Sequence, residues 1–315
     1  MVQTFKTGLL SGLKTTWTLG KIIFPVTLIV AILQYTPVLP WIIQLISPLM
    51  GIFGLSGDAA IPLVLGNFLN LYAGIAGILS VDLTVKEVFT IAVMLSFAHN
   101  LLIESSVAVK VGVKVWIMIL VRVGLAFFSA MIINLVWHGG QQTAHYGMIA
   151  PQEKQLSGIL EIGLHALEKA ALGVYQLAII VIPLMVGIQL LKDLKVLQWF
   201  SKMMSPFTRM LGMRENTSTT LAAGLLFGLA YGAGVMIQAV KEDGVSKKDI
   251  TLAFIFLVGC HAVVEDTLIF VPLGIPVLPL LLIRLVTAIL LTFIIGFIWN
   301  RRVVAKNKSS SALES

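Results

Sequence analysis

The sequence lacks most of what a soluble enzyme displays. Charged residues make up only 12% of its 315 residues, about half the share of a soluble domain. It has one cysteine, Cys260, which excludes a disulfide framework and a thiolate metal cluster. It has no serine–histidine–acid order, redox motif or nucleotide-binding loop. We therefore expect no enzymatic activity, no catalytic residues, no cofactor and no bound metal.

Hydrophobic residues are what the sequence has in excess. They make up 58% of the chain, which predicts an all-α integral membrane protein surrounded by membrane lipids. The net charge of +7 is concentrated outside the apolar segments, so it sets orientation rather than attracting nucleic acid. The first apolar run, 17–35, has no small-x-small exit, so we expect a retained spanning helix rather than a signal peptide.

The second half of the chain repeats the first at polar and glycine positions. Pro25, Gly54 and Gly66 return 158 residues later as Pro183, Gly212 and Gly224. After a four-residue insertion the offset is 162, and the matched pairs are His99 with His261, Glu104 with Asp266, and Arg122 with Arg284. Such internal duplication is typical of transporter folds. We divide the chain into a first repeat (1–137), an external linker (138–157), a second repeat (158–300) and a cytoplasmic tail (301–315).

Each repeat contains apolar runs of about the 20 residues that a spanning helix needs. In the first repeat they are 17–35, 58–81, 86–110 and 112–137, with a shorter run at 39–55. In the second they are 172–191, 216–240, 249–271 and 275–299, with a shorter run at 196–212. Amphipathic lead-in helices are predicted over 3–15 and 157–170.

The basic residues predict the orientation of the repeats. Lys6, Lys14 and Lys21 flank the first run, and Arg301 and Arg302 follow the last, so both termini are expected in the cytoplasm of a multi-pass inner-membrane protein. The linker carries only Lys154 and is expected outside. Each repeat then crosses the membrane an odd number of times, and the two repeats are inverted.

An odd number of membrane crossings conflicts with four long runs per repeat. One run in each repeat should therefore enter the membrane and leave it by the same face. The glycine-rich segments 58–81 and 216–240 are the predicted re-entrant or broken helices, because irregular backbone at membrane depth lines sites. The alternative places the turn in 86–110, with His99-Asn100 at its tip. Sequence alone leaves both open.

Ionisable groups in the middle of apolar runs form the candidate site. They are predicted to bind substrate or couple an ion, and they are His99, Glu104, His261, Glu265 and Asp266. Arg122 and Arg284 are their predicted counterions or anion clamps. At about 2.5–3.5 kcal/mol each, three unpaired acids and two unpaired arginines would cost on the order of 12–17 kcal/mol. They must therefore pair with each other, with substrate or with water.

Two asparagines add neutral polar groups to the first repeat. Asn67 and Asn70 accompany a stripe of small residues at i, i+4, i+8 whose main role is close helix packing. An amide donates and accepts hydrogen bonds, which suits a neutral polar solute such as a nucleobase or sugar. Asn67 and Asn70 therefore belong to the predicted substrate-binding set.

Two features together resemble a known family. The small-polar segment Gly54 to Pro62 and the buried His261-x-x-x-Glu265-Asp266-Thr267 resemble the nucleoside recognition, or Gate, superfamily. That group includes spore maturation membrane proteins, concentrative nucleoside transporters and the membrane part of ferrous iron transport protein B. The resemblance covers nearly the whole chain as two Gate-like units, and it implies pathway or binding roles for the candidate site residues and for Asp58. The chain has no P-loop, and Glu-Ser-Ser replaces Asp-Thr-Leu in the first repeat, so nucleoside and iron specificity stay open.

These observations favour a permease that moves a small polar or charged solute by alternating access between inverted repeats. A nucleoside-like molecule is one candidate for this solute. One rival is a lipid flippase or scramblase, in which Arg122, Arg284, Lys110 and Lys114 receive a phosphate headgroup. Another is a non-transporting membrane subunit of a larger complex. The substrate, the coupling ion and a homo-oligomeric state are left open by the sequence.

Overall fold

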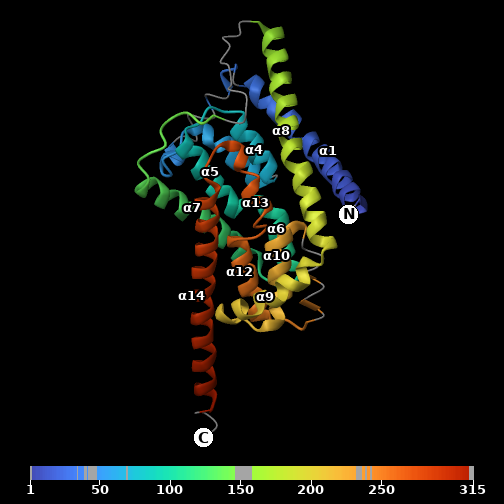
Figure 1. The fold of residues 1–315 in the computed structure, drawn as a ribbon. Coiled ribbons are helices and arrows are strands. Elements are labelled where there is room, and N and C mark those ends of the chain that lie inside the picture. The colour runs from blue at the N-terminus through green and yellow to red at the C-terminus, as the bar shows by residue number, and fades with distance from the viewer. Residues whose placement is uncertain are drawn as a thin grey trace. The chain divides into compact units, whose positions relative to one another are not determined.

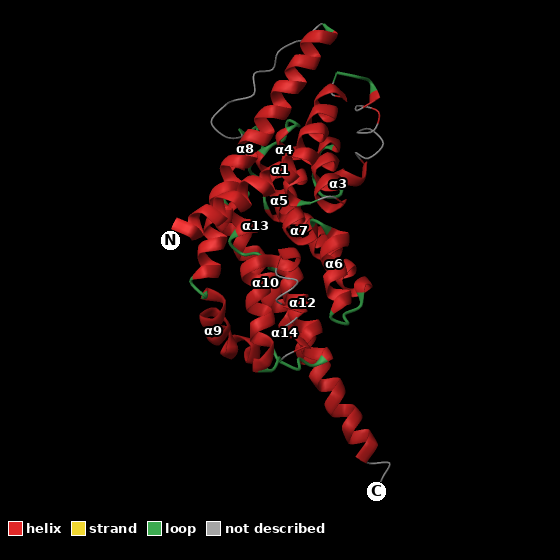
Figure 2. Cartoon of the chain, turned by 90° about the vertical axis from the view of Figure 1, so that its right-hand side faces the viewer, coloured by secondary structure: helices red, strands yellow, loops and turns green. Residues whose placement is uncertain are grey.

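Helices are the regular elements of the part of the chain that the structure describes. A computed structural model describes residues 2–33, 35–38, 41, 48–68, 70–145, 158–231, 236–237, 240–241 and 243–311. Within these ranges the paired extended backbone is limited to the isolated bridge between Thr84 and Thr143 (Figure 2). The all-α prediction is confirmed for these residues. Residues 39–40 and 42–47 of the short run 39–55, and residues 146–157 of the predicted linker, lie outside them.

The helices divide into two compact units that interleave the repeats. Unit 1 comprises Met1–Leu102, Arg122–Leu194 and Val264–Leu281, and unit 2 comprises Ile103–Val121, Lys195–Val263 and Leu282–Ser315. Unit 2 therefore takes a segment of the first repeat, and unit 1 takes segments of the second. The exchanged segments begin shortly after His99 and His261.

Two long helices pack side by side in unit 1 (Figure 1). They are α1 (Val2–Leu33) and α8 (Ile159–Asp193). A Cβ added at Gly8 would lie 2.7 Å from the Cα of Val186, and one at Gly12 would lie 2.8 Å from the Cα of Ile182. The contact therefore moves backward along α8 as it moves forward along α1, so the helices are antiparallel and held close by glycine.

The predicted lead-in helices are not separate elements. The segment 3–15, and residues 159–170 of the second lead-in, continue directly into the apolar runs behind them, within α1 and α8. No proline or glycine separates lead-in from run at either junction, so nothing in the local sequence breaks the helix. The matched prolines, Pro25 and Pro183, lie farther along, inside α1 and α8.

The segment 58–81 forms a helical hairpin in unit 1. Its elements are η1 (Gly57–Ala59), α3 (Ala60–Phe68) and α4 (Leu71–Leu79). Asn70 caps α4 by accepting a hydrogen bond from the Ala73 N–H at 2.9 Å. A Cβ at Gly77 would lie 2.7 Å from the Cα of Pro62, so α3 and α4 approach backbone to backbone. A segment that enters and leaves by one membrane face needs this helix–break–helix geometry.

The segment 86–110 is also broken, at the position that the alternative prediction gave. Helix α5 (Val85–Ala98) begins with a capping box between Thr84 and Glu87 and ends at His99. Asn100 has a φ of 49°, a left-handed conformation that a right-handed helix cannot contain. The chain then forms α6 (Leu101–Lys110) and α7 (Val115–Val136). The prediction of a single long run over 86–110 is therefore wrong.

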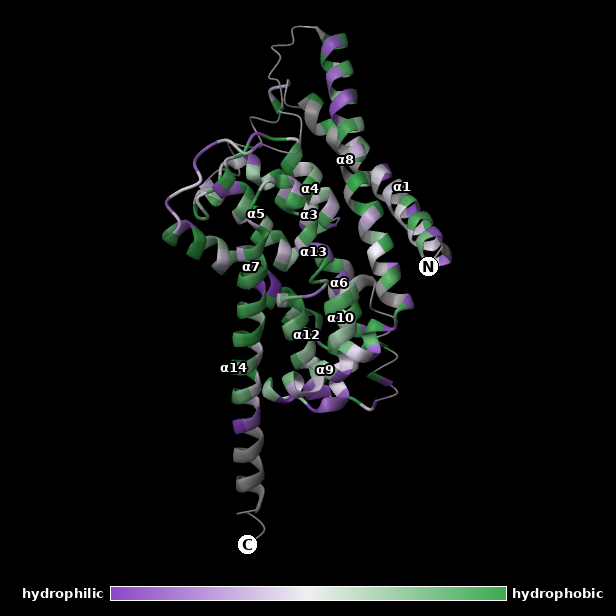
Figure 3. Cartoon of the chain, in the orientation of Figure 1, coloured by the Kyte–Doolittle hydropathy of each residue, from purple (hydrophilic) through white to green (hydrophobic). Residues whose placement is uncertain are grey.

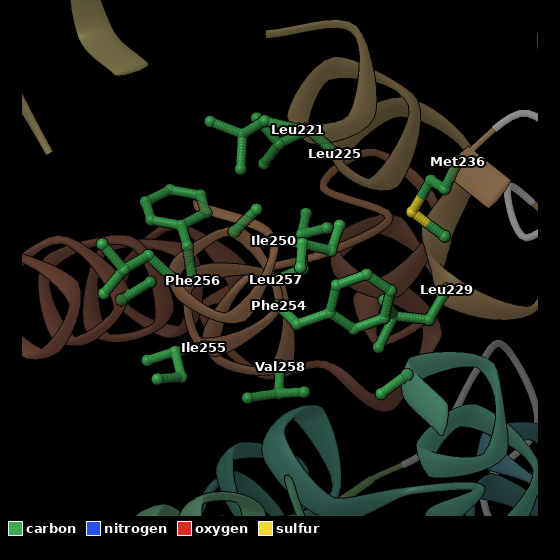
Figure 4. Packing of buried hydrophobic residues seen from close by; sticks show 14 of the residues in the cluster. Leu221, Leu225, Leu229, Met236, Ile250, Phe254, Ile255, Phe256, Leu257 and Val258 are labelled. Carbon is green, nitrogen blue, oxygen red and sulfur yellow. The ribbon is translucent and has the colours of Figure 1, made fainter. Parts of the chain in front are cut away.

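Unit 2 contains the corresponding elements of the second repeat. They are α9 (Val196–Met210), η2 (Glu215–Thr217), α10 (Ser218–Tyr231), α12 (Lys247–Gly259) and most of α14 (Val277–Ser311). Helix α10 is interrupted at Gly228, where φ is 76° and ψ is 178°. The core of the unit forms around α12, whose Phe254 and Leu257 pack with Leu221 and Leu225 of α10 (Figure 4). A helix that is apolar on every side, like α12, is stable only when it is surrounded.

The run predicted over 249–271 is broken as well. After α12 the chain unwinds through Cys260 to Val264, then forms the short α13 (Glu265–Leu268) and η3 (Val271–Leu273) in unit 1. Ala262 has a φ of 41°, which ends the helix as Asn100 does in the first repeat.

Local backbone geometry repeats at the predicted offsets. Gly54 and Gly212, 158 residues apart, have φ angles of 69° and 79°. Thr84 and Ser246, 162 residues apart, are the N-caps of α5 and α12. The elements η1 and η2 begin 158 residues apart, at Gly57 and Glu215. The duplication read from side chains therefore extends to turns and helix starts.

Two of the described helices are long and apolar enough to cross a membrane, by length and composition. They are Val115–Val136 and Val277–Arg301, and both are drawn as largely hydrophobic ribbons in Figure 3. They end the first and second repeats, respectively, as the predicted runs 112–137 and 275–299 do. Helix α14 continues to Ser311, so much of the predicted tail extends the last helix.

Candidate functional site: buried histidines at broken helices

His261 lies where α12 ends in unit 2, and its side chain is buried, with 1% of its surface exposed. Its Nδ1 lies 2.8 Å from the carbonyl oxygen of Leu257, one turn earlier. Its Nε2 lies 3.2 Å from Oε2 of Glu104 on α6. Glu104 is itself 5% exposed. The structure thus joins a histidine of the second repeat to an acid of the first, two members of the predicted site.

Arg284 stabilises the break at His261 from α14. Its NH2 donates a hydrogen bond of 2.6 Å to the carbonyl oxygen of His261, and its side chain is fully buried. A helix that ends inside a protein leaves its last carbonyls without intrahelical donors, and it concentrates negative partial charge there. A guanidinium group donates hydrogen bonds to such carbonyls, and its positive charge balances the negative partial charge. These two effects explain why an arginine is buried at this position.

The same construction occurs at His99 in unit 1. Its Nδ1 lies 2.7 Å from the Leu95 carbonyl oxygen. Arg122 on α7 donates from Nε to the Phe97 carbonyl oxygen at 2.8 Å and from NH2 to the His99 carbonyl oxygen. Arg122 is fully buried, like Arg284. Both arginines therefore hold helix ends, and the predicted counterion or anion-clamp role stays a prediction.

Both breaks are also bonded to a glycine of the neighbouring hairpin helix. The Asn100 N–H donates to the Gly66 carbonyl oxygen at 2.8 Å, and the Ala262 N–H donates to the Gly224 carbonyl oxygen at 3.1 Å. Gly66 lies near the C-terminal end of α3, where carbonyls lack helical donors. Each unwound segment thus satisfies backbone groups that hydrocarbon would leave unsatisfied.

The acids of α13 lie in unit 1 with the first-repeat residues. Glu265 Oε1 accepts a hydrogen bond of 2.6 Å from the Tyr72 hydroxyl on α4. A carboxylate oxygen of Asp266 and a ring nitrogen of His99 lie within 4.8 Å of each other. Glu265 and Asp266 are 6% and 4% exposed. His99 thus has a second-repeat acid beside it, as His261 has Glu104.

Tyr72 is a partner that the predicted site set omits. It is buried in the small-residue stripe of α4, where a hydroxyl needs a polar partner. That requirement was the available sequence signal. The identity of the partner could not be predicted, because Glu265 lies in the other repeat, 193 residues away in the sequence.

Asn67 and Asn70 have local roles in the hairpin. Asn67 donates from Nδ2 to the Leu63 carbonyl oxygen at 2.7 Å, and Asn70 Oδ1 caps α4. Both are part-buried. The hydrogen bonds described for them stay within α3 and α4, so their predicted role in binding stays a prediction.

Comparison with known proteins finds the same duplication. The family described as Gate, nucleoside recognition, matches residues 16–114 and again residues 174–276, which are separated by offsets of 158 and 162. The chain belongs to the Gate family. The resemblance predicted from Gly54–Pro62 and His261–Thr267 is confirmed. Each matched region contains the histidine at which its helix breaks, His99 or His261. Each also contains the matched acid, Glu104 or Asp266. Arg122 and Arg284 lie beyond the matched regions.

A relative supports the same assignment over the full length. The chain is 64% identical over 301 residues to a protein of Bacillus subtilis (strain 168) named "Uncharacterized membrane protein YvoD", and the match covers 96% of each chain. Together with the Gate match, this makes the chain a Gate-domain membrane protein. The membrane prediction is confirmed at this level.

Proposed function

We propose that this Gate protein is a permease of the cytoplasmic membrane, with both termini in the cytoplasm, which moves a small polar solute by alternating access between its repeats. The observation that carries the proposal is the pair of broken helices. Each ends at a buried histidine, is held by a buried arginine and has beside that histidine an acid from the other repeat. Unwound backbone with ionisable groups at membrane depth is the usual construction of a transport site.

The packing of α1 on α8 supports inversion of the repeats. These helices occupy the same place in their repeats, since Pro25 of α1 matches Pro183 of α8. They run antiparallel, as equivalent helices do when two repeats are related by an axis in the membrane plane. In such a protein, one repeat rocking against the other alternates the accessible side.

The family description and the polar groups favour a solute of the nucleoside class. A nucleoside presents amide-like donors and acceptors together with sugar hydroxyls. Asn67 and Asn70 offer amides at the turn of the hairpin, and Tyr72, Glu265 and Asp266 offer hydroxyl and carboxyl groups. Buried groups of this kind discriminate strongly between solutes, because an unsuitable solute leaves them unpaired.

Transport in reconstituted vesicles tests the proposal. We expect uptake of tritiated nucleosides from a panel containing uridine, cytidine, adenosine and guanosine, with counterflow after preloading. Replacing His261→Ala or Asp266→Asn should reduce uptake to the level of empty vesicles, because each change removes a buried site group. Matched replacements at exposed positions, His138→Ala and Asp243→Asn, should transport normally.

Equal amounts of all four variants in the membrane are the control for insertion. Normal flux through both site variants would contradict the assignment of the site. Vesicles offered fluorescent phospholipids and divalent ions in parallel test the alternatives. Lipid scrambling without nucleoside uptake would replace the permease with a lipid-handling protein, and no movement of any probe would favour a subunit that needs a partner.

A further inference from the structure

We propose that α9 is an interfacial helix of unit 2 whose outer side binds the headgroups of anionic phospholipids. This inference goes beyond the proposed permease, because neither the surface nor its test depends on a transported solute. It follows from how the side chains are distributed around α9, from the depth of the helix, and from a difference between the two repeats.

The inner side of α9 packs against the rest of unit 2. Ser201, Met204 and Thr208 are buried, and the helix lies against α10. Phe207 meets the Phe256 ring of α12 edge-on, with the ring centroids 5.7 Å apart. One side of α9 is therefore held by the protein.

An apolar stripe runs along the exposed side of α9. It consists of Trp199, Met203 and Met210, whose exposed fractions are 64%, 49% and 54%. A helix of 3.6 residues per turn places these three positions within about 40° of each other. Apolar side chains gathered on an exposed surface mark a place where another apolar phase makes contact. Tryptophan is typical of the headgroup level of a bilayer.

A basic stripe lies beside the apolar one. Lys195, the N-cap of α9, is followed by Lys202 and Arg209 at intervals of seven residues, and all three are exposed. This spacing holds them about 90° round the helix from the apolar stripe. Arg209 is paired with Glu215 at 2.7 Å, so most of the attraction for an anion comes from the two lysines.

Two such stripes on one helix fit the boundary of a bilayer. The apolar side chains enter the edge of the acyl region, while lysines extend their charged ends to the headgroups. An ammonium group there attracts the phosphate of an anionic lipid, and a zwitterionic lipid offers no net charge to attract. The expected occupant of the surface is therefore an anionic phospholipid.

The depth of α9 follows from its contact with α14. The part of α14 that is long and apolar enough to cross a membrane is Val277–Arg301. A Cβ added at Gly296 would lie 3.1 Å from the carbonyl oxygen of Leu211, and one at Gly212 would lie 3.6 Å from Nδ2 of Asn300. The two residues that follow α9 thus lie beside the last turns of that part of α14. An arginine at the end of an apolar segment lies at the headgroup level, so α9 ends at this level as well.

The matched segment of the first repeat has the apolar stripe but not the basic one. The residues 158 positions before the apolar stripe are also apolar, and they are Trp41, Leu45 and Ile52. The residues 158 positions before the basic stripe carry no charge, and they are Pro37, Gln44 and Gly51. Contact with lipid chains alone would need only the apolar residues that both copies have.

The basic residues of the second copy also do more than set orientation. Orientation depends on how many lysines and arginines a loop carries and not on their helical position. In α9 they are confined to one side of a helix, next to the residues that reach the acyl chains. The repeats are proposed to be inverted, so the second copy faces the other membrane surface. The cytoplasmic leaflet, where this copy is expected, has a negative surface potential.

Tryptophan fluorescence of the full-length protein in vesicles tests the proposal. The vesicles contain equal amounts of phosphatidylglycerol and phosphatidylcholine, and bromine atoms are placed on the acyl chains of one lipid or of the other. The surface charge is then the same in both series, and bromine quenches a tryptophan that it contacts. The emission that is lost in Trp199→Phe reports Trp199. We expect brominated phosphatidylglycerol to quench this emission more strongly than brominated phosphatidylcholine.

Removal of the lysines should remove the preference. Lys202→Gln should lower the preference of Trp199 for phosphatidylglycerol about fivefold, the contribution of one basic residue near an anionic surface. Adding Lys195→Gln should lower it further. Raising the ionic strength from about 0.1 M to about 1 M should also weaken it, because salt screens exposed charges.

The chain offers two matched controls. Trp41 is 65% exposed and has no basic residue at the matched positions, so the emission that is lost in Trp41→Phe should be quenched equally by the two lipids. Lys110→Gln removes an exposed lysine of α6, in the same unit, and should leave the preference of Trp199 unchanged. Thermal unfolding of each variant checks that it is folded.

Three outcomes would overturn the proposal. Equal quenching of Trp199 by the two lipids would exclude headgroup recognition, and so would a preference that survives the double replacement of Lys195 and Lys202. A preference as strong at Trp41, or one lowered as much by Lys110→Gln, would assign the effect to the charge of the whole protein. Quenching by neither lipid would mean that a soluble protein or a second copy covers α9.

Failure here and failure of the permease are distinguishable. Each of the three outcomes would leave nucleoside uptake as it is measured. Absence of uptake would likewise leave the quenching result to decide the lipid surface by itself.

Discussion

Arg122 and Arg284 show at the scale of single residues how a charge is accommodated inside the protein, where both side chains are fully buried. Each hydrogen bonds to main-chain oxygens at the end of a broken helix. The guanidinium group suits this position because its donors lie in a fixed planar fork. One arginine can thus serve two carbonyls, as Arg122 does for Phe97 and His99.

Replacing Arg122 with lysine should therefore destabilise the protein although the charge is kept. A lysine ammonium is a compact point charge and cannot reproduce the fork. We expect a loss of about 1.5–3 kcal/mol, the contribution of one charge-assisted hydrogen bond, measured as a lower midpoint of thermal unfolding in detergent. The matched change Arg209→Lys alters an exposed arginine paired with Glu215 and should cost less than about 1 kcal/mol. Equal shifts in the two variants would contradict the capping role.

Residue roles were only partly predictable from the sequence. The burial of His99, Glu104, His261, Glu265 and Asp266 followed from their apolar surroundings. Their pairing did not, because Glu104 meets His261 and Tyr72 meets Glu265 across long separations in sequence. The capping bonds of Arg122 and Arg284 require knowing where α5 and α12 end. That end is set by left-handed residues, Asn100 and Ala262, and alanine there has no sequence signature.

At the scale of elements, the hairpin of α3 and α4 depends on the absence of side chains. Within this hairpin Gly77 has the closest backbone neighbour, since a Cβ added there would lie 2.7 Å from the Cα of Pro62. Backbone atoms cannot turn aside as a flexible side chain can. The two helices must separate if a methyl group is added.

The replacement Gly77→Ala should therefore destabilise the hairpin by about 1–3 kcal/mol, the usual cost of overpacking. Gly187→Ala on α8 provides the control, because an added Cβ there meets nothing within 4 Å. Alanine at that open helical position should be neutral or stabilising. Thermal unfolding measures both, and a Gly77→Ala variant as stable as the control would exclude close α3–α4 packing.

Helix breaks were predictable where glycine and asparagine interrupt an apolar run, whereas other helix bounds were not. The hairpin was expected because glycine and asparagine interrupt the apolar pattern of 58–81. The continuity of α1 through 3–33 was missed, because amphipathic and apolar stretches looked like different elements although no breaker divides them. The break in 249–271 was missed for the opposite reason: Cys260 to Val264 contains no proline or glycine, and only tertiary contacts unwind it.

At the scale of the whole molecule, the proposed inversion of the repeats predicts on which side of the membrane the termini and the linker lie. In a Cys260→Ser background, single cysteines at Gln3, Gln141 and Asn307 report the two termini and the linker. We expect a membrane-impermeant maleimide to label Gln141→Cys on intact cells, and to label Gln3→Cys and Asn307→Cys only after permeabilisation. Labelling of the two termini from opposite sides would exclude an odd number of crossings per repeat.

The duplication itself was predicted from the sequence, whereas the interleaving of the units was not. The two Gate matches have the same offsets as the matched residues, and the bounds of the predicted repeats, linker and tail stay a prediction. Nothing in either repeat alone indicates that Ile103–Val121 and Val264–Leu281 are exchanged between the units. Exchange depends on long-range packing, which sequence periodicity does not report.

The exchange has a consequence for the separated halves of the chain. His261 contacts Glu104 of the other repeat, and Glu265 accepts a hydrogen bond from Tyr72 of the other repeat. A polypeptide cut between the repeats would therefore contain neither contact within either fragment. Each repeat depends on the other for the polar partner of its own buried groups.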